Sequence, residues 1–531
     1  MKPWRLKGIL GLVALLYIAL GWNIFTIQIK EGAVYLERAE AREDGETAPL
    51  ARRGRIFARD RSGNVAPVVL NKEFPVAFAV PKEIKDPESV AAQVALVLNL
   101  DQESLASILA KPNDPYEPLL KKISSNQIRA LTALQLPGIY VRNEVFRFYP
   151  FERLAAHVLG FVGPSDDSAY EEGRYGIESL KDDTLGGGAA VILTIDRNTQ
   201  TQSERVLGDL VERFQAAGGS VIIEEVETGR IVALGNSPSF DPNNYIEFAV
   251  RDYLNPAVQS VYEPGSVFKP ITMAIGLDTG AITPEMTFYD TGELTLNGYT
   301  IKNWDLKAYG QTSMTQVIER SINTGAAFAA RQIGREPFYE YLVKFGFDRK
   351  TGIELPGEVV GNLNNLIHYP RDINYATAAF GQGVAVTPIE LISAFSAIAN
   401  EGVMMKPHIL EANGPEAVRR VVSREAAAAT VKMMFSAVEK SHVAQIPGYT
   451  IAGKTGTAQV PDLKRGGYSD DFVHTYIGFV PAEKPQFAVL LKIDNPQGAT
   501  LAGTTVVPAF RELAEFLINY YNIAPDNLKP E

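Results

Sequence analysis

Near its centre the sequence reads Glu263-Pro264-Gly265-Ser266-Val267-Phe268-Lys269-Pro270, and the rest of the chain is interpreted outward from this segment. Ser266 and Lys269 are three residues apart, which places both side chains on one face of a helix. Pro264-Gly265 predicts the turn that begins the helix, and the apolar residues after Pro270 predict that it is buried and ends near Gly280. The serine then lies at the positive end of the helix dipole, where an alkoxide is stabilised, and a neutral lysine can take its proton.

This pair is a weak signal on its own. Ser-x-x-Lys is expected by chance roughly once or twice in such a chain, and its plainer interpretation is a polar pair on a surface helix. Two later motifs favour catalysis. Ser321-Ile322-Asn323 lies between a helix opened by the capping box of Ser313 and the next helical run, where short polar side chains face a cleft. Lys454-Thr455-Gly456-Thr457 lies on an alternating strand, with Gly456 where a substrate backbone would approach.

Single copies of the motifs also occur elsewhere. Ser62-Gly63-Asn64 and Ser124-Ser125-Asn126 match the second motif, but both precede Ser266 and belong to another module. Lys350-Thr351-Gly352 matches the third motif, but its surroundings predict a polar turn rather than the middle of a strand. The specific signal is therefore the ordered set of Ser266/Lys269, Ser321/Asn323 and Lys454/Thr455/Gly456.

Composition excludes several classes of protein. The 531 residues carry a formal net charge of −11, which argues against general nucleic-acid binding. There are no cysteines, so disulfides, thiolate metal sites and cysteine nucleophiles are excluded. The five histidines show no zinc-binding spacing, and no metal or organic cofactor is predicted. The length suits two or three domains.

The N-terminus predicts a membrane anchor. The 22 residues 8–29 carry no charge, which is enough for one membrane-spanning helix. Lys2, Arg5 and Lys7 precede this segment, so residues 1–7 are expected in the cytoplasm and everything after about Lys30 outside it. The alternatives are a signal peptide cleaved after Gly21 and, more remotely, a buried helix of a soluble protein.

Residues 30–190 predict a module of mixed structure. A charged helical stalk is expected at 33–44 and a β-hairpin around Ser62-Gly63-Asn64. Helices are expected at 86–98, 101–110 and 125–134, and a strand at 139–148. His157, beside an apolar run, is interpreted as a structural histidine. The run Gly186-Gly187-Gly188 indicates a junction.

Residues 191–523 predict the catalytic domain, and 524–531 a tail. A strand at 191–195 and a helix at 198–217, stopped by Gly218-Gly219, precede a hairpin of strands 220–226 and 230–235. A mainly helical block follows, in which Thr387 and Ser423 open two helices. Strands return at 449–460, 472–480 and 487–493, before a last helix at about 508–521. This order predicts an α+β fold with one antiparallel sheet assembled from both ends of the domain and flanked by helices.

At the three motifs the chain resembles the penicillin-recognising serine enzymes, whose signature is S-x-x-K, S-D-N and K-T-G. Ile322 replaces the Asp of that signature, which the wider S-x-N form allows. With its anchor, its Arg53-Gly54 segment and Gly381-Gln382-Gly383, the chain looks like a class B penicillin-binding protein. Asn323, Trp304-Asp305 and the segment 156–161 resemble the division (septal) branch more than the elongation branch. The resemblance covers nearly the whole chain and is firmest over 191–495.

The resemblance implies a serine D,D-transpeptidase that cross-links peptidoglycan and is acylated by β-lactams. Ser266 would attack the penultimate D-alanine of a stem peptide, with Lys269 as the general base. Ser321 and Asn323 would relay protons and position the reacting groups, and Lys454 would control the electrostatics of that relay. Thr455 and Thr457 would bind the substrate carboxylate. The N–H groups of Ser266 and Thr457 would form an oxyanion hole.

By the same resemblance, the module at 30–190 would be a non-catalytic pedestal or dimerisation-type module that docks partners. The expected partners are a polytopic glycosyltransferase of the shape, elongation, division and sporulation family and other division proteins. A D,D-carboxypeptidase or β-lactamase, with water as the acceptor, remains an alternative. So does a catalytically silent scaffold or β-lactam sensor.

Overall fold

The structure is a computed structural model that describes residues 53–112, 114–164, 171–462 and 464–526. The predicted anchor at 8–29 and stalk at 33–44 lie outside these residues. Among the described residues, no helix has the length and apolar character needed to cross a membrane. The chain divides into two compact units: unit 1 contains Pro67–Pro150 and Asp183–Ala190, and unit 2 contains Phe57–Ala66, Phe151–Asp182 and the chain from Val191 onward.

Unit 1 is built on a long antiparallel pair of strands. β2 (Val65–Ala79) pairs with β4 (Ile139–Phe148) and, near its end, with β3 (Glu117–Leu120). Helices α3 (Pro87–Leu98), α4 (Gln102–Leu109) and α5 (Ser125–Leu134) pack their apolar faces against one end of this sheet. Asp86 and Asp101 accept the capping hydrogen bonds of α3 and α4. The predicted helices and the strand at 139–148 are therefore confirmed.

Unit 2 contains a five-stranded antiparallel sheet in the order β16-β17-β18-β8-β9. Its strands are β8 (Gly218–Glu225), β9 (Ile231–Ser237), β16 (Ala452–Pro461), β17 (Tyr468–Val480) and β18 (Phe487–Asp494). β18 pairs with β8, so strands that are about 270 residues apart lie side by side. This confirms the α+β fold and the sheet assembled from both ends of the domain. β16 lies at the edge of the sheet.

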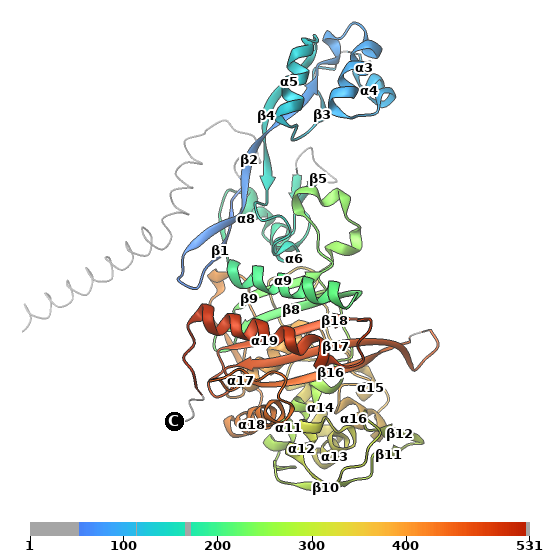
Figure 1. Cartoon of the computed structure of the whole chain (residues 1–531), viewed down its shortest axis with the longest axis vertical. Helices are drawn as coiled ribbons and strands as arrows, with labels where there is room; N and C mark the ends of the chain where they lie inside the picture. The colour runs from blue at the N-terminus through green and yellow to red at the C-terminus, as the bar shows by residue number, and fades with distance from the viewer. Residues whose placement is uncertain (1–52, 113, 165–170, 463, 527–531) are drawn as a thin grey trace, which may run out of the picture. The chain divides into compact units, whose positions relative to one another are not determined.

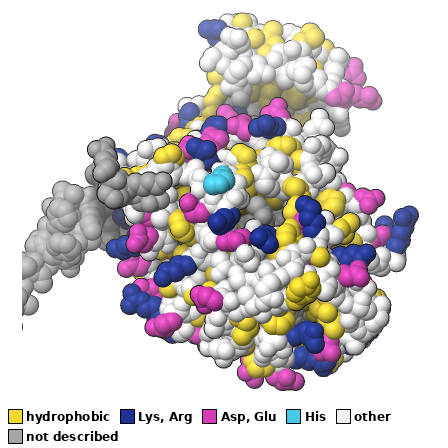
Figure 2. Space-filling model, turned by 60° about the horizontal axis from the view of Figure 1, so that its bottom comes forward, with side chains coloured by type: hydrophobic (Ala, Val, Ile, Leu, Met, Phe, Trp, Pro, Cys, Tyr) yellow, Lys and Arg dark blue, Asp and Glu magenta, His cyan; other side chains and the backbone are white. Residues whose placement is uncertain are grey.

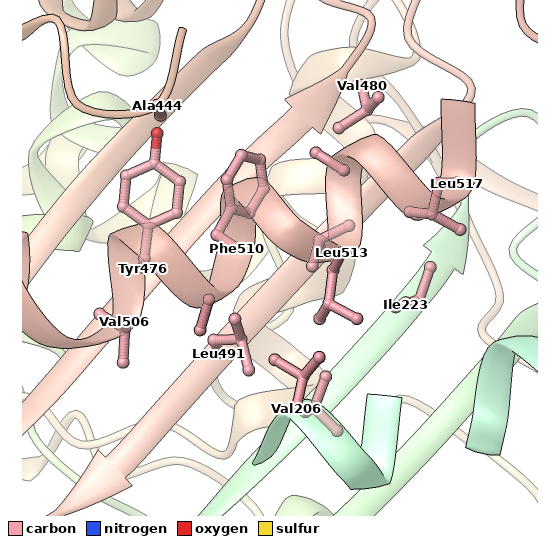
Figure 3. Close-up of a cluster of buried hydrophobic side chains, with 14 of the residues drawn as sticks. Val206, Ile223, Ala444, Tyr476, Val480, Leu491, Val506, Phe510, Leu513 and Leu517 are labelled. Carbon is pink, nitrogen blue, oxygen red and sulfur yellow. The ribbon is translucent and has the colours of Figure 1, made fainter. Parts of the chain in front are cut away.

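Helices cover both faces of this sheet. α9 (Arg197–Arg213) and α19 (Ala502–Tyr521) lie side by side over one face (Figure 1). Between them and the strands lies an extensive apolar core, in which Phe510, Leu513 and Leu517 of α19 pack against residues of the strands (Figure 3). On the other face, Phe395 of α17 (Pro388–Ala399) packs against Phe479 of β17, with ring centroids 6.2 Å apart. The sheet is thereby buried on both sides.

The helical part of unit 2 lies beyond α17 and contains most of the remaining helices (Figure 1). These helices are α11 (Lys269–Asp278), α12 (Met314–Arg320), α13 (Asn323–Ile333), α14 (Arg335–Lys344), α15 (Asn364–Ile367), α16 (Asp372–Ala378) and α18 (Arg424–Ser441). The capping boxes of Ser313 and Thr387 and the cap of Ser423 are all present, as predicted. Several short elements precede the sheet in the chain: α6 (Ala156–Leu159), β5 (Val162–Pro164), β6 (Glu171–Gly173), α7 (Gly176–Leu180) and β7 (Val191–Asp196). The short helix α10 (Pro256–Gln259) lies between β9 and α11.

Three details of unit 2 differ from the predictions. α9 ends at Arg213, and Gly218-Gly219 belong to β8; a Cβ at Gly219 would lie 2.6 Å from the Lys492 carbonyl oxygen, so glycine serves close strand packing there. α19 begins at Ala502 and contains Pro508, which had suggested a later start. The described residues of the helical block also contain six short strands: β10 (Thr287–Asp290), β11 (Glu293–Leu296), β12 (Tyr299–Lys302), β13 (Gly310–Ser313), β14 (Val403–Met405) and β15 (Ala417–Arg420). Two of them, β11 and β12, form a hairpin whose apolar residues alternate around Asn297-Gly298, a local pattern that the predictions overlooked.

The surface carries charges of both signs. On the face seen in Figure 2, Lys and Arg side chains are interspersed with Asp and Glu side chains, and no large patch of a single sign is visible. Hydrophobic side chains are scattered among them. Charged and apolar side chains are therefore mixed on this face.

Burial of Glu224 predicts that the stability of unit 2 depends on pH. Its side chain in β8 is fully buried, its Oε2 accepts a 3.5 Å hydrogen bond from Ser393, and its Oε1 has no partner. Burial raises the pKa of Glu224 to about 7. Because the folded carboxyl holds its proton more tightly than the unfolded one, the contribution of Glu224 to the free energy of unfolding should be greatest below about pH 4.5 and fall as pH rises through 7.

Glu224→Gln should remove part of this pH dependence. The change in the free energy of unfolding between pH 4.5 and 8 should become smaller by up to about 3 kcal/mol. Chemical unfolding followed at several pH values measures it. Burial also raises the pKa values of Glu204 and Glu390 to about 7, so some dependence should remain. Exposed Glu227→Gln is the control. An unchanged slope for Glu224→Gln would show that its carboxyl ionises in the folded protein as it does in the unfolded chain.

Candidate active site

Ser266 lies in a tight turn that leads directly into α11. The turn spans Gly265–Phe268, and Lys269 is the first residue of the helix. Gly265 has a φ of +60°, and its N–H donates to the carbonyl of Gly381 at 3.1 Å. A Cβ at Gly265 would lie 2.8 Å from the Cβ of Ala458. Glycine is therefore required ahead of the serine, both by its backbone angle and by the close approach of β16.

Lys269 is the centre of the polar cluster. Its side chain is completely buried. Its Nζ lies 2.9 Å from Ser266 Oγ, 3.1 Å from Ser321 Oγ, 2.6 Å from the Ser321 carbonyl oxygen and 2.8 Å from Asn323 Oδ1. When the amine is neutral, the contact with Ser266 can reverse, so that the hydroxyl donates to Nζ. This is the geometry of a nucleophile and its base.

The electrostatics of the cluster favour a neutral lysine. Burial, with a further contribution from the nearby charge of Lys454, holds the pKa of Lys269 well below its usual value. Burial also lowers the pKa of Lys454 to about 7. Two buried ammonium groups that face one hydroxyl cannot both be protonated cheaply. One of the two amines can therefore accept a proton near neutral pH.

Ser321 and Asn323 come from the junction of α12 and α13, as predicted. Ser321 ends α12 with a positive φ of 58°, and Asn323 is the first residue of α13. The Ser321 hydroxyl accepts from Lys454 Nζ at 2.9 Å as well as from Lys269. Asn323 Nδ2 donates to the carbonyl of Lys302 at 2.9 Å. Ser321 thus connects the two lysines, and Asn323 connects Lys269 to the end of β12.

The third motif lies on the edge strand β16. Lys454 points toward Ser321, whereas the Thr457 hydroxyl accepts from the backbone N–H of Ala502 at 3.1 Å. Gly456 has a different neighbour from the one predicted: a Cβ there would lie 2.9 Å from the Pro264 carbonyl oxygen and 3.0 Å from a Val267 methyl. Its small size therefore admits the turn that carries the serine. Thr455 is half-buried in the same strand.

The three rejected motif copies make local contacts of their own. Ser62 and Asn64 lie in a turn, where both backbone N–H groups donate to Asp60. Ser124 is the N-cap of α5. Thr351 lies in a loop and donates to Glu358. Each copy therefore has a local structural role, although Ser62 lies in the same compact unit as Ser266 and not in another module as predicted.

His157 is a structural residue, as predicted. Its ring is buried, its Nε2 lies 3.0 Å from the Asp252 carbonyl oxygen, and it packs edge-on against Phe240. Burial lowers the pKa of His157 to about 4. In the described residues, no group of three or more His, Asp or Glu side chains is placed to hold a metal ion.

Two sets of hydrogen bonds beside the catalytic cluster were not predicted from the sequence, those of Glu263 and those of Asn303. Glu263 accepts from the Gly383 N–H at 3.0 Å and from the Tyr468 hydroxyl at 2.9 Å, so it links the serine segment to β17. Asn303 is buried and bonds to Asp290 and Thr324 behind Asn323. Glu263 belongs to the segment quoted first and could have been suspected. Asn303 lies in a polar loop without any pattern.

Comparisons with known proteins identify two family regions. Residues 219–515 match the penicillin binding protein transpeptidase domain, and residues 49–211 match the penicillin-binding protein dimerisation domain. The chain is 32% identical to stage V sporulation protein D of Bacillus subtilis over 506 residues, covering 86% of this chain and 76% of the relative. It is 28% identical to the peptidoglycan D,D-transpeptidase FtsI of Escherichia coli, covering 99% and 93%.

Solved structures agree with these matches. A peptidoglycan synthetase from Bifidobacterium adolescentis is similar with a TM-score of 0.67 and 26% identity, covering 91% of this chain and 97% of the other. A penicillin binding protein 3 from Mycobacterium is similar with a TM-score of 0.66 and 28% identity, covering 73% and 94%. The similarity thus extends over both family regions.

Proposed function

This chain belongs to the class B penicillin-binding proteins and is a peptidoglycan D,D-transpeptidase, and from this premise we propose that Ser266 is its nucleophile. One observation carries the assignment: Lys269 Nζ, fully buried, lies within hydrogen-bond distance of both Ser266 Oγ and Ser321 Oγ. A serine with a buried amine at this distance is an activated hydroxyl.

Acylation follows from these contacts. Neutral Lys269 takes the Ser266 proton as Oγ attacks the carbonyl of the penultimate D-alanine, which forms a tetrahedral intermediate. The C–N bond to the terminal D-alanine then breaks, and its nitrogen leaves with a proton delivered through Ser321 from the lysines. Ser321 suits this relay because its hydroxyl contacts both Lys269 and Lys454. Asn323 Oδ1 holds the Lys269 amine in place.

The substrate would be held by β16. An edge strand can pair with an extended peptide, which would bring the donor peptide alongside Thr455 and Gly456. The Thr455 and Thr457 hydroxyls would bind its carboxylate; Thr457 accepts from Ala502 and can still donate its own proton. The N–H groups of Ser266 and Thr457 would stabilise the oxyanion, a contact worth roughly 10²–10³ in rate per donor.

The second half-reaction transfers the acyl group to an amine. A primary amine from a neighbouring stem peptide attacks the ester carbonyl and loses a proton to the relay. The bond between the ester carbonyl carbon and Ser266 Oγ breaks, and Oγ regains its proton from the same relay. The product is a cross-link, and the serine is restored. Peptidoglycan stem peptides and β-lactams are the ligands that family membership implies.

The biological setting completes the proposal. Residues 8–29 would anchor the chain once in the cytoplasmic membrane with its N-terminus inside, and residues 191–523 would act outside it. The module at 30–190 would dock a polytopic glycosyltransferase and division proteins. Among the relatives is a stage V sporulation protein D as well as FtsI. We place this chain in septal cell-wall synthesis, on Asn323, Trp304-Asp305 and the segment 156–161.

Intact-mass measurement of the full-length protein with a penicillin, followed by peptide mapping, tests the nucleophile. The expected result is one stable adduct on the peptide that contains Ser266. Release of D-alanine from a stem peptide, with and without an added amine acceptor, tests the reaction. An adduct lost within seconds would indicate a hydrolase, and a stable adduct without D-alanine release would indicate a sensor. A folded protein without an adduct would contradict the assignment.

Lys454→Met should move the pH profile of penicillin acylation toward higher pH. The charge of Lys454 helps to hold the pKa of Lys269 down, so removing it should raise that pKa. Neutral Lys269 would then appear only at higher pH, and the rising limb of the rate–pH curve should shift in the same direction. Acylation rates between pH 5 and 9 measure the shift. Exposed Lys464→Met on the same hairpin is the control, and an unshifted limb for Lys454→Met would remove Lys454 from this role.

A further inference from the structure

An exposed tryptophan lies beside the catalytic cluster, and no step proposed above uses it. Trp304, in the turn after β12, has 54% of its surface exposed, and Leu306, two residues later, has 75% exposed. Tryptophan is on average highly buried in folded proteins, since its indole carries the largest apolar surface of any side chain. An exposed indole beside a catalytic centre suggests a contact with a ligand that binds and dissociates during the reaction.

Hydrogen bonds on both sides of Trp304 attach this turn to the catalytic residues. The indole N–H donates to the carbonyl of Arg320 at 3.2 Å, and Arg320 is the residue before Ser321. Asn323 Nδ2 donates to the carbonyl of Lys302, two residues before Trp304. The indole is therefore fixed at the border of the segment that carries Ser321 and Asn323.

A buried network makes this turn a defined part of the site. Asn303 Nδ2 donates to Asp290 Oδ2 at 2.9 Å, and Asn303 Oδ1 accepts from the Thr324 N–H at 3.2 Å. All three side chains are almost fully buried. Buried polar groups that satisfy one another hold a single arrangement. Trp304 is thus positioned relative to α13 by the residue directly before it.

The proposed chemistry distinguishes the two sides of the cleft. The donor peptide lies along β16, because its carbonyl must face the N–H groups of Ser266 and Thr457. The attacking amine must lose a proton to a base within hydrogen-bond reach, and the groups that can take it converge on Ser321. The amine therefore approaches from the Ser321 side, where Trp304 lies. In Figure 1, β11 and β12 and the tip of the β16–β17 hairpin extend on the same side of unit 2.

We propose that Trp304, with Leu306 beside it, is the contact surface for the acceptor strand in the transfer step. The ligand is a second stem peptide, and the indole packs against the methylene groups of the side chain that carries its primary amine. Packing of this kind uses apolar area and leaves the polar amine end of the side chain directed at the ester. The inference rests on the proposed function, because it assigns a subsite to the second half-reaction of that site.

The test compares the two fates of one acyl-enzyme. Full-length protein in detergent receives a synthetic stem-peptide thioester as donor and a stem peptide with a free side-chain amine as acceptor. Hydrolysed and cross-linked products are quantified as the acceptor concentration is varied. Penicillin acylation is measured separately, because it requires Ser266 and Lys269 but no acceptor. The variants are Trp304→Ala, Trp304→Phe and, as the control, Tyr289→Ala, an aromatic 72% exposed on β10 of the same insert.

Trp304→Ala should lower the ratio of cross-linked to hydrolysed product by about tenfold at a given acceptor concentration, equivalent to about 1.4 kcal/mol. Its penicillin acylation should stay within about twofold of the wild type. Trp304→Phe should recover most of the ratio, and Tyr289→Ala should not change it. An unchanged ratio in Trp304→Ala would overturn the proposal. Equal loss of acylation and transfer would overturn it too, because that indicates a structural role. Failure of the wild type to form a penicillin adduct would instead contradict the proposed nucleophile.

Discussion

Ser266→Ala should form no covalent adduct with a penicillin and should lose transpeptidation almost completely. Removing the nucleophile of an acyl-transfer enzyme costs on the order of 10⁶ in rate, because covalent catalysis and its activated oxygen disappear together. The fold should persist, since the substitution removes one hydroxyl, which accepts a 2.9 Å hydrogen bond from Lys269. Intact-mass analysis after incubation with the antibiotic measures adduct formation directly.

The matched control for this experiment is Ser62→Ala. Ser62 belongs to a motif copy of the same type as Ser321-Ile322-Asn323, but it lies in an exposed turn whose N–H groups donate to Asp60. Ser62→Ala should be acylated like the wild type. A stable adduct on folded Ser266→Ala would mean that another residue is the nucleophile and would remove the basis of the mechanism.

Lys269→Met should lower the rate of penicillin acylation by about 10²–10⁴, the usual contribution of a positioned general base. Methionine has a similar length and fits a fully buried position, so the change removes the amine and leaves the volume nearly filled. Without an amine 2.9 Å from its oxygen, Ser266 has no base to take its proton at neutral pH. Acylation rates from stopped reactions at several antibiotic concentrations measure the effect.

Lys440→Met provides the comparison, because Lys440 is exposed near the end of α18. Its acylation rate should match the wild type. Thermal unfolding of both variants separates loss of the base from loss of the fold. If folded Lys269→Met were acylated at the wild-type rate, Lys269 would not be the base, and Lys454 would become the candidate through Ser321.

Much of the fold could be predicted because local patterns carry it. Helix caps such as Asp86, Ser313 and Thr387 use a side chain and a backbone N–H two or three residues apart, so the sequence shows both partners. The order of strands early and late in the catalytic domain indicated a sheet closed from both ends. The hairpin of β11 and β12 was overlooked although its apolar residues alternate around Asn297-Gly298, which is a local signal. The strands β10 and β13 are short and pair with each other across the longer segment between them, so neighbouring residues do not show both partners. Gly218-Gly219 was misread as a helix stop because the close strand partner, β18, is distant in sequence.

In the candidate site, too, some features could be predicted from the sequence and others could not. Motif order singled out Ser266, Lys269, Ser321, Asn323 and Lys454, and the structure brings these five together in one cluster. The structure adds a reason for glycine at 456, since a Cβ there would meet the turn at Pro264, which local sequence did not indicate. Thr457 also contacts the start of α19, which no local pattern indicated.

The sequence by itself determined which residue types carry the chemistry, their order along the chain and the elements that bear them. Those features follow from spacing, capping and periodicity, which are properties of neighbouring residues. Only the tertiary structure decided the state of the two lysines. Their pKa values fall because the surrounding elements exclude water, and because Lys454 meets Ser321 across 133 residues of sequence. Desolvation depends on every residue that packs around a group, so the lowered pKa of Lys269 cannot be predicted from the sequence near it.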